Sequence, residues 1–236
     1  MAGNKSNSFS SFEILMKIFS SLFLLFGSSM AFADPTSLAE LKFRKFIPAQ
    51  HSLFEFIEGD LNKDGVNDAV LIIKKIDKSN WVTHNLSGKK VDRNRRGIIV
   101  LINKNGKYKE LTQNLTAFSS ENDDGGVYFA PELSFEIKKN ILEVNYSHGR
   151  YGYWGYKFRV DGNNMQLIGY DLSSNHGPYT DYQTSINFIS QKKLFRKNVN
   201  LVDRDQPEVF EDTWSTIHYQ PIYLSKIKDF DRLNFD

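Results

Sequence analysis

The chain has 236 residues, of which 25% are Asp, Glu, Lys or Arg, and its formal net charge is +2. Because positive and negative residues are interspersed and nearly cancel, the charge gives no reason to expect a nucleic acid or an anionic membrane as a partner. The sequence contains no cysteine. Disulfide bonds are therefore excluded, and stability has to come from packing and from any bound metal ion.

Residues 1–33 have the pattern of a secretory signal peptide. Lys17 precedes the short apolar run 18–26, and residues 31–33 read Ala-Phe-Ala, which is typical of a cleavage site. The apolar run is shorter than the roughly 20 residues of a membrane span. We therefore expect an exported protein with no membrane span after cleavage and a single β-rich domain over 34–236. Export without cysteines favours a bacterial periplasmic or secreted protein; an N-terminal anchoring helix is the alternative.

The first element after the signal is expected to be a short helix that ends before Pro48. Ser37, with Glu40 three residues later, forms a capping-type start. Apolar side chains then fall in two groups, Leu38 with Leu41 and Phe43 with Phe46 and Ile47, and the steps inside each group are three or four residues, as in an amphipathic helix.

The rest of the chain has the pattern of antiparallel β-structure, with short apolar or alternating runs separated by turn residues. The expected strands and hairpins are 53–57, 69–73, 97–102 with 108–111, 133–137 with 142–146, 156–160 with 165–170, and 184–190 with 193–197. Long polar connections are expected at 77–96, 113–130 and 200–213, whereas 214–228 has a mixed pattern. The predicted fold is mainly β, with antiparallel meanders forming a sandwich or a partial propeller-like domain and one short N-terminal helix.

The stretch 59–68 reads Gly-Asp-Leu-Asn-Lys-Asp-Gly-Val-Asn-Asp and has the spacing of a calcium-binding loop. Gly65 stands where a chain that wraps around an ion must turn sharply. The expected ligands are the side-chain oxygens of Asp60, Asn62, Asp64 and Asp68 and the backbone carbonyl of Val66. An EF-hand is excluded, since its closing Glu is replaced by Leu71 and the flanking runs are strands. An Asx-rich turn without metal is the alternative.

This strand–loop–strand unit resembles the calcium loops of FG-GAP and VCBS-type modules, the first of which are best known from integrin-like β-propellers. The resemblance covers residues 56–75 and implies the same five ligands and a calcium ion that stiffens the corner between two strands. A single loop does not support a repeat array. The whole mature chain, especially the stretches 59–73, 93–101, 118–133 and 148–178, is similar to a set of exported bacterial proteins that have no established activity.

A second unusual stretch, 147–156, combines aromatic residues, glycines and Arg150. Tyr, Trp and Arg are enriched at the centres of binding interfaces, and glycine permits close approach of another surface. The hairpin predicted around residues 161–164 would bring residues 175–176 to the same end of the sheet as His148 and Arg150. The candidate binding surface comprises His148, Arg150, Tyr151, Tyr153, Trp154 and His176. Packing of the same aromatic residues into the sheet is the alternative.

A catalytic site is the third possibility for this region, although no catalytic motif supports it. The weak candidates are Glu121, Asp123, His148 and His176, with Asp171 as a further partner for a glycosidase-like carboxylate pair. The two histidines lack the spacing of a zinc motif. Ser173 and Ser174 lack the G-x-S-x-G context of a hydrolase nucleophile.

We expect an exported, calcium-binding protein that acts by binding a protein or an envelope glycan, and the lack of a catalytic motif favours a non-enzyme over an enzyme. A periplasmic immunity protein and an envelope-binding protein are the two forms of this hypothesis. The immunity form rests on analogy of location and size alone. The rival hypothesis is a hydrolase of cell-envelope glycan or peptide that uses the His, Glu and Asp candidates.

Overall fold

The structure is a computed structural model that describes residues 35–85, 87–122, 131–200, 207–233 and 235. The expected signal peptide and Asp123 lie outside the described residues. Pro35–Asp236 form one compact unit. In the part of the chain that is described, no helix is long and apolar enough to cross a membrane.

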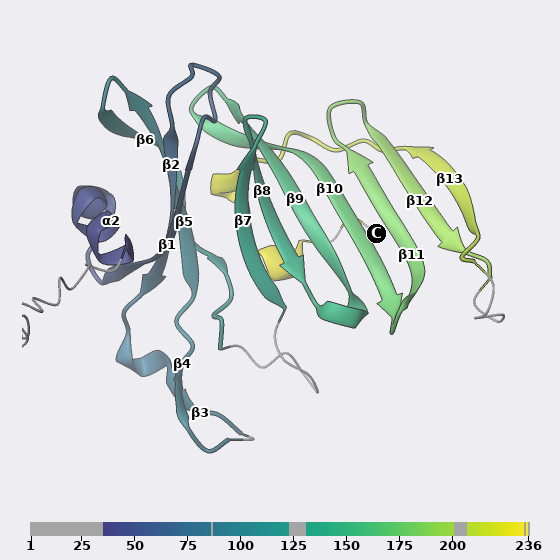
Figure 1. The fold of residues 1–236 in the computed structure, drawn as a ribbon, viewed down its shortest axis with the longest axis horizontal. Coiled ribbons are helices and arrows are strands. Elements are labelled where there is room, and N and C mark those ends of the chain that lie inside the picture. Colours follow the sequence, from purple (N-terminus) through teal and green to yellow (C-terminus); the bar gives the residue numbers. More distant parts are fainter. Residues whose placement is uncertain (1–34, 86, 123–130, 201–206, 234, 236) are drawn as a thin grey trace, which may run out of the picture. The chain divides into compact units, whose positions relative to one another are not determined.

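Two open antiparallel sheets make up most of this unit (Figure 1). The small sheet has the order β1-β2-β5-β6, and its strands are β1 (His51–Gly59), β2 (Asp68–Lys75), β5 (Arg96–Lys104) and β6 (Lys107–Phe118). The large sheet runs from β13 to β7 in reverse chain order, with β7 (Glu132–Lys138), β8 (Ile141–Ser147), β9 (Gly152–Asp161), β10 (Asn164–His176), β11 (Tyr179–Asn187), β12 (Lys192–Asn198) and β13 (Phe210–Thr216). A two-stranded arm of β3 (Trp81–Thr83) and β4 (Lys90–Asp92) projects from the connection between β2 and β5.

The predicted mainly β fold of antiparallel meanders with one short helix is confirmed. All three predicted connections are partly wrong. Within 77–96, residues 81–83 and 90–92 form β3 and β4, because their backbones pair with each other. Residues 113–118 continue β6, because their backbones pair with β5 as far as Phe118. Residues 210–216 form β13, which pairs with β12 along its whole length.

The two sheets share one hydrophobic core, to which each contributes alternate side chains. Val70, Ile72 and Val100 from the small sheet pack with the large-sheet residues Val144 and Phe158, and all five are fully buried. Since side chains alternate across a strand, each large-sheet strand turns its remaining residues to the opposite face. We call the face with the core the inner face of the large sheet and the opposite face its outer face.

Helix α2 (Pro35–Phe43) and the following turn η1 (Arg44–Phe46) cover the other side of the small sheet. The predicted apolar stripe is wrong in part. Ala39, Phe43 and Ile47 are buried against the sheet, whereas Leu38 and Leu41 are 58% and 76% exposed. Steps of four residues place the three buried side chains on one face of the helical segment, which turns the two leucines away from it.

The last part of the chain returns to the core beside the large sheet (yellow in Figure 1). Its two short turns, η4 (Leu224–Lys226) and η5 (Phe230–Arg232), bring buried Leu224 and Phe230 into the core. The hydroxyl of Tyr156 lies 3.2 Å from each of the carbonyl oxygens of Phe230 and Leu233. The segment therefore completes the core by apolar packing and by this buried contact.

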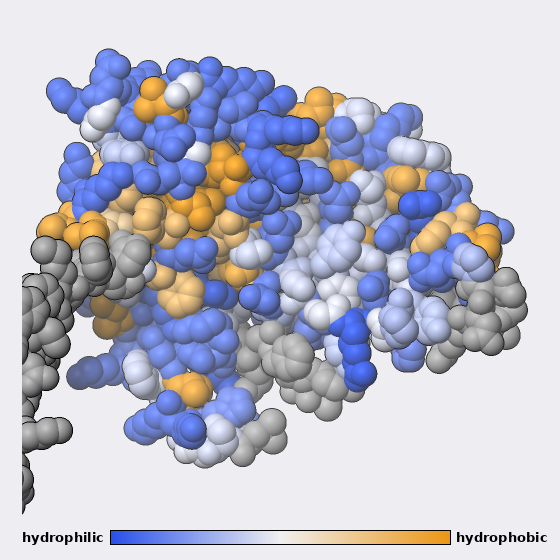
Figure 2. Space-filling view, in the orientation of Figure 1, coloured by the Kyte–Doolittle hydropathy of each residue, from blue (hydrophilic) through white to orange (hydrophobic). Residues whose placement is uncertain are grey.

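Apolar and polar surfaces are separated on the visible side of the molecule (Figure 2). Hydrophobic side chains gather between α2 and β7 and again where β12 and β13 meet, while the surface over β9 to β11 is mostly pale or blue. A polar surface over the middle of a sheet is compatible with a face that no other element covers.

Candidate functional site

The loop between β1 and β2 contains the predicted calcium ligands and already has a wrapped backbone. The Asp60 carboxylate accepts backbone hydrogen bonds from Lys63 at 2.6 Å and Gly65 at 3.1 Å. Asn62 and Asp64 accept bonds from amides two residues further on, each at 2.9 Å. Lys63 and Gly65 both have a positive φ, which lets the loop curl within a few residues.

Asp68 lies deeper than the other acids of this loop. It is fully buried, and its two carboxylate oxygens accept hydrogen bonds from the backbone amides of Leu61 at 2.9 Å and Asn103 at 2.8 Å. Burial raises the pKa of Asp68, and the negative charges of Asp64 and Asp60 raise it further, although the two amides act in the opposite direction. The loop thus concentrates negative charge that a cation would neutralise.

The acid at the start of the loop has the opposite shift. Desolvation tends to raise the pKa of Asp60, but hydrogen bonds from the loop amides, led by those of Gly65 and Lys63, outweigh it and lower the pKa. Asp60 is therefore held as a carboxylate, which is the form that ligates calcium.

The donor set of the loop fits calcium in its chemistry, since all five expected ligands are oxygen atoms. Within the described part of the chain, no three His, Cys, Asp or Glu side chains are grouped so that they could hold a metal ion. The carboxylates of Asp60 and Asp64 instead accept hydrogen bonds from groups of the same loop, which include the Asn62 side-chain amide at 3.0 Å from Asp64. A carboxylate oxygen has a second lone pair, so these hydrogen bonds leave acceptor capacity for an ion.

The loop lies at a junction between the two sheets. The side-chain amide of Asn140, in the turn between β7 and β8, donates to the backbone carbonyl of Asp60 at 2.8 Å. Gly59 packs so closely on Ile137 of β7 that a Cβ there would lie 2.8 Å from its Cγ2 atom. An ion in the loop would therefore stiffen both the β1–β2 corner and its contact with the large sheet.

The candidate binding residues at the end of β8 form a short turn, η3 (Gly149–Tyr151), which contacts β10. Arg150 is exposed and stacks over Tyr151, with 5.3 Å from its guanidinium carbon to the ring centroid. The rings of His148 and Tyr151 are 5.2 Å apart. His176 is exposed at the last position of β10, opposite Tyr179 of β11.

Tyr153 and Trp154 lie on opposite faces of the large sheet. Tyr153 is 50% exposed on the outer face. Trp154 is half-buried, and its ring stacks on Tyr146 of the inner face with 5.0 Å between centroids. Because neighbouring residues of a strand point to opposite sides, Trp154 does not share a surface with Tyr153, and its placement in the predicted surface needs this correction.

The outer face of the large sheet has a hollow with a volume of about 420 Å³, lined by side chains from β8 to β12. Two acids, Glu143 and Asp171, and two bases, Lys157 and Arg196, line it together with Tyr153. Lys157 pairs with Asp171 at 2.6 Å, and the hydrogen bond and charge of Asp171 raise the pKa of Lys157. None of these five side chains is buried, so no described element covers the hollow.

Glu121 belongs to a different network, which lies at the end of the small sheet. It pairs with Lys74, whose side chain is only 8% exposed and which also pairs with Asp92 at 3.1 Å. Asp171 bonds instead to Lys157 and Ser185 on the outer face. Glu121 and Asp171 thus each have their own partners, and the contacts of Glu121 do not include the histidine candidates.

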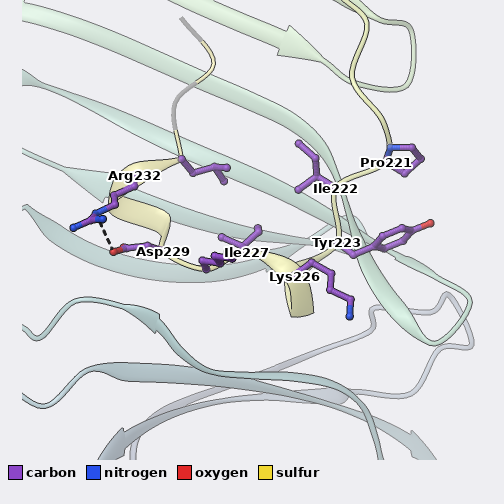
Figure 3. Close-up of a pocket in the computed structure, with 9 residues that line it drawn as sticks. Pro221, Ile222, Tyr223, Lys226, Ile227, Asp229 and Arg232 are labelled. Atoms are coloured by element: carbon purple, nitrogen blue, oxygen red, sulfur yellow. Dashed lines mark ion pairs between the residues drawn. The ribbon is translucent and has the colours of Figure 1, made fainter.

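A further hollow, of about 670 Å³, lies along the C-terminal segment (Figure 3). Apolar side chains such as Ile222 and Ile227 line it together with Lys226 and Arg232. Asp229 lies 3.8 Å from Arg232 and pairs with Arg95 of the β4–β5 connection at 3.0 Å. None of the residues selected from the sequence lies in this hollow.

No family model, no curated protein and no solved structure matches the chain. Interpretation of the site therefore rests on its residues. The sequence alone did not single out Glu143, Lys157, Gln183 and Arg196 of the outer face. The signal that identifies them is the register of the sheet, which aligns residues that are far apart in the chain.

Proposed function

We propose that the chain is an exported bacterial protein that binds calcium in the loop 60–68 and acts by binding another macromolecule. The observation that carries the binding role is the uncovered outer face of the large sheet, with half-exposed Tyr153 beside the exposed turn that contains Arg150. Exposed Tyr and Arg side chains supply contact area and hydrogen bonds at interfaces. An envelope-binding role and a periplasmic immunity role both fit such a surface.

The hydrolase alternative has less support. Glu121 is engaged by Lys74 and by the side-chain amide of Asn122. His148 contacts Tyr151, and His176 is exposed at the end of β10. A general acid has to reach the scissile bond together with its partner, and these contacts do not bring such a pair together.

The calcium part of the proposal is tested by thermal unfolding of the full chain in calcium and in EGTA. A bound ion stabilises the folded state in proportion to the logarithm of its concentration over its dissociation constant. We expect calcium to raise the unfolding temperature of the natural chain and to have no effect on the double variant Asp60→Ala/Asp64→Ala. The matched control, Glu110→Ala/Glu136→Ala, removes two exposed acids outside the loop and should keep the response. No response in the natural chain would contradict calcium binding.

The binding part is tested by co-sedimentation of the full chain with isolated envelopes of the producing bacterium. We expect sedimentation to fall in Tyr153→Ala and Arg150→Ala, because both remove exposed contact groups. Trp81→Ala on the β3–β4 arm is the control, since Trp81 is 49% exposed and lies away from this surface. A chain that stays in solution contradicts envelope binding and leaves a soluble protein, as in the immunity form, as the partner to seek.

A further inference from the structure

The hollow on the outer face of the large sheet has a bare floor because Gly155 lies within it and a second glycine, Gly169, lies beside its lining residue Lys157. Gly155 of β9 stands opposite Asn145 of β8, and a Cβ at Gly155 would lie 2.6 Å from the Asn145 side-chain oxygen. Gly169 of β10 stands opposite Lys157, whose aliphatic stem passes 3.3 Å from the position of a Cβ there. The Asn145 amide and the Lys157 stem therefore lie across the strands instead of standing upright.

The polar groups around this floor are held in place by one another. Asp171 accepts from Lys157 and from the hydroxyl of Ser185, both at 2.6 Å. The guanidinium of Arg196 donates to Asp212 at 2.9 Å and lies 3.5 Å from the side-chain oxygen of Gln183. Groups that are already fixed lose little conformational entropy when a ligand binds.

The charges of the hollow cancel. Its two acids, Glu143 and Asp171, are matched by Lys157 and Arg196, and three of these four groups are already engaged in ion pairs. A phosphate or another anionic ligand would have to break one of these pairs to gain a basic partner. A neutral ligand with many hydroxyl groups would use the remaining donor and acceptor capacity of the same groups without breaking a pair.

Exposed aromatic rings stand on both sides of the hollow. Tyr153 on β9 is 50% exposed, and Trp214 on β13 is 65% exposed. The register aligns Trp214 with Leu194 on the outer face, as Tyr153 is aligned with Ser173. Four strand spacings separate β9 from β13, which is about 19 Å in a flat sheet. A ligand that contacts both rings is therefore an extended chain that crosses the strands.

We propose that the outer face of the large sheet binds a neutral polysaccharide chain, whose sugar rings stack on Tyr153 and Trp214 and whose hydroxyl groups bond to Asn145, Asp171 and Gln183. Sugar rings have apolar faces and polar edges, which suit amphipathic aromatic rings beside fixed polar groups. This inference rests on the proposed binding role and names its ligand class. It requires no metal and no reaction.

The test is native affinity electrophoresis of the full chain in gels that contain dextran, mannan, laminarin or, as an anionic comparison, alginate. We expect at least one neutral polysaccharide to retard the natural chain and the control Trp81→Ala. Tyr153→Ala should weaken the apparent affinity about tenfold, because aromatic anchors carry much of the binding energy. Gly155→Val should abolish retardation, because its side chain fills the floor, and Gln183→Ala provides a milder change in case that variant does not fold.

The inference would be overturned if no neutral polysaccharide retarded the chain, or if the natural chain and Tyr153→Ala were retarded equally. Retardation by alginate alone would also overturn it, since it would indicate an anionic ligand. Co-sedimentation with envelopes separates this failure from failure of the binding role. A chain that sediments without glycan retardation binds something else, whereas a chain that does neither loses support for both proposals.

Discussion

The buried carboxylate of Asp68 accepts the backbone amide hydrogen of Asn103 at 2.8 Å, so that the loop after β1 is fixed to the end of β5. Its other oxygen accepts from Leu61 at 2.9 Å. This acid therefore has a structural role that does not depend on calcium. The carboxylates of Asp60 and Asp64, which are more exposed, accept their hydrogen bonds from groups of the loop itself.

Asp68→Ala should destabilise the fold even in EGTA. The substitution leaves the amides of Leu61 and Asn103 without their acceptor, and each unsatisfied buried group costs about 1–3 kcal/mol. We expect a total loss of about 3 kcal/mol in the free energy of unfolding, measured with urea. Asp64→Ala, in the exposed part of the same loop, should lose less than about 1 kcal/mol. Equal losses in the two variants would contradict the structural role.

Acid should weaken the corner that follows β2. The pKa of Asp77 is lowered to about 2 by hydrogen bonds from Ser79 and Lys75, from an ordinary value of 3.8. A lowered carboxyl pKa stabilises the fold above the ordinary value, and this contribution is lost as the pH falls toward the folded pKa. Asp77→Asn should therefore flatten the decline of unfolding free energy between pH 3.8 and about 2. If the free energy of unfolding declined equally with acid in both proteins, the hydrogen bonds to Asp77 would make no net contribution to stability.

Gly152, at the start of β9, should tolerate no side chain. It has a φ of +112°, and a Cβ there would overlap the carbonyl oxygen of Ser173. We expect Gly152→Ala to cost about 3 kcal/mol or more, since both the strained backbone and the overlap contribute. Gly162→Ala is the matched control, because φ there is also positive, at +58°, but the surrounding space is open. It should cost about 1 kcal/mol. Urea denaturation measures both losses, and equal midpoints for the two variants would contradict the expected overlap at Gly152.

Lys74 should matter more for stability than Glu121. The lysine side chain is 8% exposed, whereas that of Glu121 is 34% exposed. Lys74→Met leaves two carboxylates without a counter-charge, and we expect a loss of about 2 kcal/mol. Glu121→Gln leaves the lysine paired with Asp92, so its loss should stay below about 1 kcal/mol. Chemical denaturation measures both, and a larger loss in Glu121→Gln would reverse the assignment of these roles.

The sequence predicts those strands correctly whose buried residues form a continuous or alternating apolar pattern along the chain. The continuous apolar runs of β2 and β5 and the alternation in β7 and β8 indicate strands directly. The strand β13 has no such pattern, because six of its seven residues are exposed, and only its pairing with β12 makes it a strand. Leu38 and Leu41 illustrate the reverse problem, since their hydrophobicity does not reveal which helix face meets the sheet.

The candidate site was predictable in part for the same reason. Alternation from Val144 and Tyr146 would have placed Trp154 inside and Tyr153 outside once the pairing of β8 and β9 was known. The outward orientation of Asp171 could not be predicted in this way. A bulge between Leu167 and Gly169 shifts the alternation of β10, so that Asp171 points outward although simple counting from Leu167 would bury it. Sequence spacing does not report such a shift.

The buried contact of Tyr156 with Phe230 and Leu233 also has a consequence for the order of folding. Side chains from near the end of the chain fill the space next to strands that were synthesised much earlier. Contacts between residues so far apart form late and slow the search for the native state. The core beside Tyr156 therefore stays incomplete until residues that follow it by 74 and 77 positions have been synthesised and have packed against it.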